Sequence, residues 1–175
     1  LPLLSRTKEQ RDNKARALAL WGKISTVLSD AELCARNGDL DRADSRLSEG
    51  IELCRAELKA GDFADVHYFL CRLHAARGEW PDASGECDLA LALDPGLEEA
   101  RFSKAMIELR DYSRKASECR AMSGGEVSYT GTPRSLSPVD LEALYPELKA
   151  LREQVLHKLS GCGKRRYCQL LWMKA

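Results

Sequence analysis

The segment that most constrains the fold of this chain is Gly78–Pro95. It starts with a glycine, the residue that most readily ends a helix in a left-handed turn. Pro81 follows at a position suited to the first turn of a new helix, because its missing N–H needs no partner there. Residues that favour helices continue to Leu93, and Asp94-Pro95 then end the run. The segment predicts a helix end, a tight turn, a second helix and a stop.

A partial copy of the same pattern lies upstream. Asn37–Ala43 repeats the turn, and an apolar helical face follows it at Leu47, Ile51, Leu53 and Leu58. A third, degenerate copy covers Gly96–Met122, in which the turn glycine is missing. A helix pair of this kind cannot bury its apolar face alone, so the two and a half to three copies must stack.

Gly78–Pro95 resembles the second half of a tetratricopeptide repeat (TPR), in which a glycine, an aromatic residue and an alanine set the turn and the close helix contact. Trp80 and Ala83 stand at the aromatic and alanine positions, and the resemblance covers roughly residues 24–122. It implies an all-α fold, a short α-solenoid of stacked antiparallel helix pairs with an N-terminal helix and a C-terminal capping helix. It also implies a scaffold that binds proteins and carries no chemistry of its own.

Within that family the segment is most similar to the co-chaperone branch, whose members clamp the C-terminal carboxylate of heat-shock chaperones. Such a clamp needs an asparagine and several basic side chains, because a buried carboxylate must be met by charged donors. Phe69 stands at the asparagine position and Glu99 at the first basic position of the third repeat, with Ser103 and Lys104 at the other basic position. The chain therefore lacks the clamp residues.

The predicted helices are separated by Gly, Pro and Asp signals, and no segment alternates with a period of two, so no sheet is expected. Ser29-Asp30 is a second N-cap signal that breaks or kinks the first helix. The seven helical segments are 7–29, 40–59, 65–77, 81–93, 97–110, 113–122 and 139–159. The predicted domains are a TPR-like helical domain at 1–122, a Gly/Ser/Pro-rich linker at 123–138, and an amphipathic helix with a basic and aromatic tail at 139–175.

The last helix carries an apolar stripe with steps of three and four residues, at Leu141, Leu144, Leu148, Leu151, Val155 and Leu159. Such a stripe must be covered, either by the preceding repeat or by a partner. The linker is either a flexible connector or a docked loop that could occupy a groove of the chain itself.

The inner helices of stacked repeats line a concave groove. Helical phase from Gly38, Gly78 and Ala105 places nine residues there: Glu32, Arg36, Asp65, Tyr68, Phe69, Arg72, Phe102, Ser103 and Met106. In the alternative interpretation the aromatic members of this set only pack against the terminal helices.

The tail is the second candidate contact surface. Its basic and aromatic residues, which face either RNA or a partner protein, are Lys164, Arg165, Arg166, Tyr167 and Trp172. His157, Cys162 and Cys168 do not make a structural zinc site, because the cysteine spacing is too wide and a fourth ligand is missing. We expect no metal and no cofactor.

Lys plus Arg and Asp plus Glu number 27 each, so no overall charge recruits nucleic acid or an acidic membrane. No segment approaches the roughly 20 apolar residues that cross a bilayer. The cysteines are odd in number and lie mostly on apolar helical faces, at positions 34, 54, 71, 87, 119, 162 and 168. This pattern predicts reduced, packed thiols in an intracellular reducing compartment, either the cytoplasm or a mitochondrial or other organellar matrix. A start at Leu1 is expected either for a chain cut there or for one that has lost a targeting peptide.

Motifs for catalysis are missing from the sequence. His67 and His74 are read as satisfied core or groove histidines, and no nucleophile elbow, P-loop or dinucleotide fingerprint occurs. The sequence thus predicts a non-enzymatic protein–protein interaction scaffold, a small subunit of a larger assembly, organellar or otherwise. The alternatives are an RNA-associated subunit of a ribonucleoprotein, which would use the basic tail, and a divergent heat-shock co-chaperone.

Overall fold

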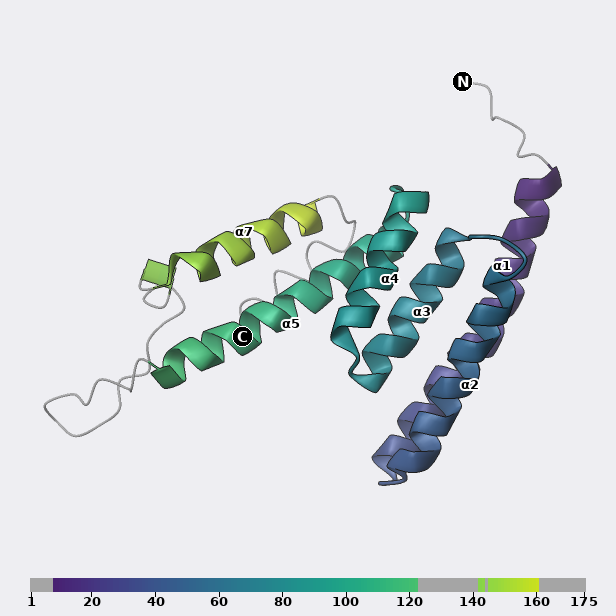
Figure 1. The fold of residues 1–175 in the computed structure, drawn as a ribbon, viewed down its shortest axis with the longest axis horizontal. Coiled ribbons are helices and arrows are strands. Elements are labelled where there is room, and N and C mark those ends of the chain that lie inside the picture. Colours follow the sequence, from purple (N-terminus) through teal and green to yellow (C-terminus); the bar gives the residue numbers. More distant parts are fainter. Residues whose placement is uncertain (1–7, 123–141, 144, 161–175) are drawn as a thin grey trace, which may run out of the picture. The chain divides into compact units, whose positions relative to one another are not determined.

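The computed structural model of the chain describes residues 8–122, 142–143 and 145–160. Over these residues the fold is helical and contains no strand, which confirms the predicted all-α class (Figure 1). The helices are α1 (Lys8–Arg36), α2 (Leu40–Leu58), α3 (Ala64–Arg77), α4 (Trp80–Leu93), α5 (Glu98–Met122) and α7 (Pro146–Ser160). None of these helices is both long enough and apolar enough to span a membrane.

The chain divides into two compact units, Leu1–Ala100 and Arg101–Ala175. The helix α5 begins in the first unit and continues into the second. Each unit has a hydrophobic core of its own.

In the first unit α1 packs against α2, α2 against α3, and α3 against α4, and α1 also contacts α3 (Figure 1). Each of the first three helices contributes an apolar stripe with steps of three and four residues, which is the spacing of one helix face. The buried members are Leu20, Ile24, Val27 and Ala31 from α1, Ala43, Leu47, Ile51 and Cys54 from α2, and Val66, Phe69, Leu70 and Leu73 from α3. The sequence suggested a break or kink at Ser29-Asp30, but α1 is one helix through this point. The apolar stripe that continues to Ala31 explains why, because it keeps this part of α1 packed on the core.

The turn between α1 and α2 and the turn between α3 and α4 have the same geometry. Gly38 and Gly78 have φ angles of 82° and 80°, in the left-handed region that favours glycine. In the first turn the N–H of Gly38 donates to the carbonyl oxygen of Ala35 at 3.0 Å. The N–H of Asp39 donates to the carbonyl oxygen of Cys34, five residues earlier, at 2.9 Å. In the second turn the corresponding bonds are 3.1 Å and 2.9 Å. These are the two bonds of a Schellman motif, so the turn read from Gly78 and its upstream copy are both confirmed.

Small residues bring the helices close together. Gly50 is buried in α2, and a Cβ atom added there would lie 2.8 Å from Cδ2 of Leu73 and 3.1 Å from Cγ1 of Val27. In α4 the buried residues are Ala83, Cys87 and Ala90, all fully enclosed. The alanine expected five residues after each turn glycine is buried in both hairpins, as Ala43 and Ala83.

In the second unit the predicted pair of helices at 97–110 and 113–122 is wrong, because α5 is one helix of 25 residues. No glycine or proline lies between Arg110 and Ser113 to end it. Tyr112 is buried, and the hydroxyl of Ser113 donates to the carbonyl oxygen of Leu109 at 3.1 Å, so both residues are accommodated inside the helix. A missing turn signal therefore means a continuous helix here.

Those residues of the last helix's stripe whose side chains the structure describes pack against α5 of the same chain. Leu148 and Val155 are fully buried, the first with Tyr112, Ala116 and Cys119 and the second with Ala105 and Leu109. Packing onto the chain itself was one of the two predicted alternatives. The predicted helix is interrupted: Glu142 and Ala143 are helical, Tyr145 is not, and α7 begins at Pro146.

Cys71 of α3 and Cys87 of α4 form a disulfide, with their Cα atoms 5.6 Å apart. The expectation of reduced thiols is therefore wrong for this pair. The two cysteines face each other from two closely packed helices, and their spacing in the sequence did not reveal this. Cys54 agrees with the expectation, since it is a fully buried thiol. Burial, followed by the charges of Glu86 and Glu57, raises the pKa of Cys54 to about 12.

Candidate functional site

A groove lies between α1 and α3 in the first unit. Its apolar part is a cavity of about 410 Å³, within the range of small ligand sites. It is lined by Lys14, Ala17, Leu18 and Trp21 of α1, Asp65, Tyr68 and Phe69 of α3, and Leu97 and Glu99 at the start of α5. Leu18 is 70% exposed, so one wall presents an uncovered apolar side chain.

Three aromatic rings form the floor of this cavity. The ring of Trp21 stacks on Phe69 at a centroid distance of 5.2 Å and lies 6.4 Å from that of Tyr68. Phe69 is only 5% exposed and belongs to the core, whereas Trp21 and Tyr68 are half-buried and present part of their surface to the groove. Phe69 belongs to the core and contacts both of the other rings, so it helps to position them.

Arg72 continues the floor along α3. Its guanidinium lies 5.7 Å from the centre of the Trp21 ring, a cation–π distance, and donates a hydrogen bond to the Tyr68 hydroxyl at 3.2 Å. These contacts hold the polar edge of Tyr68 in place.

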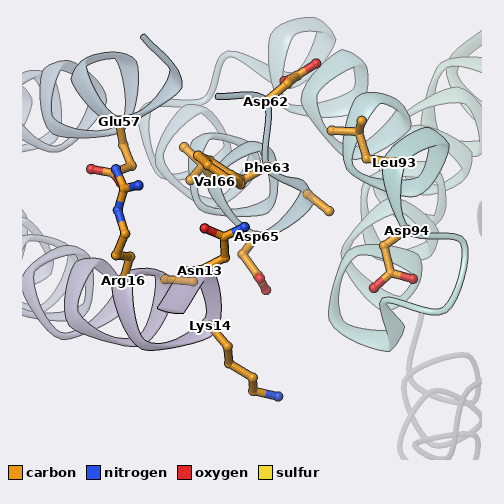
Figure 2. A pocket seen from close by; sticks show the side chains of 12 residues that line it. Asn13, Lys14, Arg16, Glu57, Asp62, Phe63, Asp65, Val66, Leu93 and Asp94 are labelled. Carbon is orange, nitrogen blue, oxygen red and sulfur yellow. The ribbon is translucent and has the colours of Figure 1, made fainter. Parts of the chain in front are cut away.

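A second cavity of about 420 Å³ shares Lys14, Ala17 and Asp65 with the first, so the two make one groove. Figure 2 shows this charged part, with Arg16 and Glu57 meeting at one side of the opening and Asp94 at the end of α4. The guanidinium of Arg16 is 2.5 Å from Oε1 of Glu57 and also lies over the ring of Phe63. One cation and one carboxylate of the lining are thus paired with each other.

The charged part of the groove has an acidic surplus. Its lining contains the carboxylates of Glu57, Asp62, Asp65 and Asp94 and the cations Lys14 and Arg16, and the apolar part adds Glu99. Burial raises the pKa of Asp65; Lys14 opposes the shift, while the charges of Asp94 and Glu99 add to it. Asp65 therefore lies close enough to Lys14, Asp94 and Glu99 to be affected by the charge of each.

His67 ties this end of the groove to α4. Its Nε2 is 2.6 Å from Oδ1 of Asp62, and its Nδ1 is 2.6 Å from Oε2 of Glu86. Burial lowers the pKa of His67, but the hydrogen bonds and charges of the two carboxylates outweigh burial and raise the pKa above its ordinary value. The two carboxylates therefore favour the imidazolium form, in which both ring nitrogens can donate.

His74 is buried near the second turn, and its Nδ1 lies 2.6 Å from Oε2 of Glu79. His74, Glu79 and Asp82 each offer one atom of a type that can bind a metal ion, and these three atoms lie within 4.8 Å of one another. Glu79 also pairs with Arg77 at 3.4 Å. The hydrogen bond and the ion pair account for His74 and Glu79. Both His67 and His74 have hydrogen-bond partners, as predicted.

A third cavity of about 670 Å³ lies near the other ends of α1 and α3. Its lining is mostly small and apolar, and it includes Glu32 and Arg72. Glu32 pairs with Arg36 one turn later at 2.5 Å, and both side chains are exposed.

Of the nine predicted groove residues, Asp65, Tyr68, Phe69 and Arg72 come together at the α1–α3 groove. Glu32 and Arg36 lie further along α1. Phe102, Ser103 and Met106 fall in the second unit, where Phe102 and Met106 pack against the core formed by Ala105, Leu109 and Val155. The tail residues 164–167 and 172 and the linker 123–138 lie outside the described residues, so their predicted roles stay predictions.

Sequence reasoning missed Lys14, Leu18 and Trp21 on α1. The signal was present: counting back from Glu32 in whole helical turns, at 3.6 residues per turn, reaches positions 21, 18 and 14. Asp94 was missed because it was treated only as part of the signal that ends a helix, and Glu99 because it was treated only as a departure from the clamp pattern.

A scan against protein-family models finds no matching family, and searches of curated proteins and of solved structures find no significant match. Functional inference for this chain therefore depends on its own residues and geometry.

Proposed function

We propose that the chain is a non-catalytic scaffold, a small subunit of a larger assembly, that binds another protein through the groove between α1 and α3. The observation that carries the proposal is the aromatic floor of Trp21 and Tyr68, packed on the buried Phe69, beside the exposed Leu18. Aromatic anchors with neighbouring apolar surface are the usual centre of a protein–protein contact.

The proposal includes a TPR-like architecture, in which α1 with α2 and α3 with α4 are successive repeats. Two facts support it: both hairpins turn at a left-handed glycine with the same hydrogen bonds, and both bury an alanine five residues later. In such a stack α1 and α3 are the first helices of their repeats and line the concave face. On this proposal the groove between α1 and α3 belongs to that face.

Site-specific photocrosslinking tests the proposal in cells. A photoreactive amino acid replaces Leu18 in one variant and Leu33 in a matched variant; both positions are exposed leucines on α1, at 70% and 59%. We expect a discrete crosslinked protein from position 18 and none from position 33. The double variant Leu18→Ser, Tyr68→Ala should lose this partner with unchanged helical content. Phe69 is not a suitable target, because its replacement would disturb the core.

Crosslinking that is equal at the two positions, or that survives the double variant, would overturn the proposal. The groove would then not be the contact surface.

A further inference from the structure

We infer that the groove takes a basic peptide segment: a lysine or arginine side chain of the partner lies between Asp65, Asp94 and Glu99, and a neighbouring apolar side chain lies against Trp21 and Tyr68. This inference rests on the proposed function and adds the chemistry of the partner.

Charge is the first argument. Three charges of the lining already have partners: Arg16 pairs with Glu57, and Asp62 pairs with His67. What remains is Lys14 against the three carboxylates of Asp65, Asp94 and Glu99. An incoming cation would offset this surplus, whereas an acidic peptide would add to it. The groove thus has the opposite charge preference from a clamp for carboxylate tails.

The state of Asp65 supports this arrangement. Its pKa is raised first by burial and then by Asp94 and Glu99, and Lys14 only partly opposes the shift. Its carboxylate is therefore destabilised in the unbound chain, and a partner cation would stabilise it. Figure 2 shows Asp65 and Asp94 at the same opening, reached from α3 and from the end of α4.

Shape is the second argument. The acidic part and the aromatic part of the groove are continuous through Lys14, Ala17 and Asp65. Lysine and arginine lay their aliphatic stems along apolar surface while the charged head reaches a polar site. A segment that alternates apolar and basic residues matches both parts at once.

The test uses short synthetic peptides with the same apolar residues and with lysine and arginine, glutamate, or serine at the remaining positions. Fluorescence polarisation measures their binding to the full chain. We expect the basic set to bind at least about tenfold more tightly than the others, and its affinity to fall as salt is raised. The triple variant Asp65→Asn, Asp94→Asn, Glu99→Gln should weaken the basic set by about tenfold or more.

The substitutions are chosen to keep the local structure. Asn at position 94 retains the side-chain oxygen that accepts from the N–H of Gly96 at 2.8 Å. A control variant, Asp41→Asn, Glu147→Gln, Glu153→Gln, removes the same charge from exposed positions outside the groove and should bind like the wild type. If the triple variant loses helical content, Glu99→Gln alone, at an exposed position, provides the measurement.

The outcomes separate this inference from the proposed function. If the serine or glutamate set binds best and the Leu18→Ser, Tyr68→Ala variant loses it, the groove binds peptides but the basic preference is wrong. Equal weakening by the triple and control variants would also overturn the basic preference. If no peptide set binds in a way that depends on Leu18 and Tyr68, the proposed function fails as well.

Discussion

Gly50→Ala and Gly85→Ala are the same chemical change in the middle of two helices, and we expect opposite effects on the free energy of unfolding. In both variants the helix gains about 1 kcal/mol, because alanine restricts the unfolded chain more than glycine does. At Gly85 nothing lies within 4 Å of the new Cβ atom, so this gain is the whole effect.

At Gly50 the new Cβ atom would lie 2.8 Å from Cδ2 of Leu73 and 3.1 Å from Cγ1 of Val27. Leu73 is fully buried and cannot swing away into solvent. Overpacking of this kind costs about 1–3 kcal/mol, which offsets or exceeds the helix gain. The gain in helix stability is common to both variants. The difference between their free energies of unfolding therefore measures the cost of the packing contact alone, about 1–3 kcal/mol.

Thermal unfolding followed by circular dichroism measures the difference, and the two variants should melt roughly 4–20 °C apart, with Gly85→Ala the higher. Gly22→Ala, at an exposed position in α1 with nothing within 4 Å, is a second reference and should also be stabilised. If Gly50→Ala is stabilised as much as Gly85→Ala, α2 does not pack against Leu73 and Val27, and the arrangement of the first unit is wrong.

Three further predictions concern the groove end, the disulfide and the second unit. Because its pKa is raised in the folded state, protonated His67 stabilises the fold; this stabilisation is fully present below the ordinary pKa of 6.5 and is lost as pH rises through the folded-state pKa. Urea titrations across this range should show the free energy of unfolding falling with pH. His67→Gln should remove this pH dependence together with about 1.5–3 kcal/mol of stability at the acidic end. Reduction of the Cys71–Cys87 bond should lower the free energy of unfolding by about 3 kcal/mol, and peptide mapping before and after reduction should recover the linked pair. Leu148→Ala should cost about 2–5 kcal/mol and raise hydrogen exchange along α7, whereas unchanged exchange would mean that α7 is not held by α5.

Local signals predicted the elements of the first unit well. Gly78 and Gly38 each specify a backbone angle that other residues adopt only at a cost, so both turns could be read from the sequence. The helix ends at Arg36 and Arg77 follow directly from these glycines. Where the glycine was missing, after Arg110, the sequence-based division of α5 was wrong, since the resemblance to a repeat was followed there against the local evidence.

The site was harder to predict because its walls come from segments far apart in the chain. The phase of a single helix was enough to put Tyr68 and Asp65 on the face of α3 that lines the groove. Trp21 depended on which face of the long helix α1 meets α3, and an error of one position turns a side chain by about 100°. The disulfide between Cys71 and Cys87 depended on the distance between two helices, which no local pattern encodes.

The paired glycine turns have a consequence for how such chains diverge. In each hairpin one glycine has a positive φ, Gly38 or Gly78, and one small residue lies buried five positions later, Ala43 or Ala83. Most of the other positions need only an apolar residue where the helix faces the core. Substitutions can therefore accumulate over nearly the whole length of the helices without loss of the hairpin. The shape of such a unit would outlast recognisable similarity between the sequences that encode it.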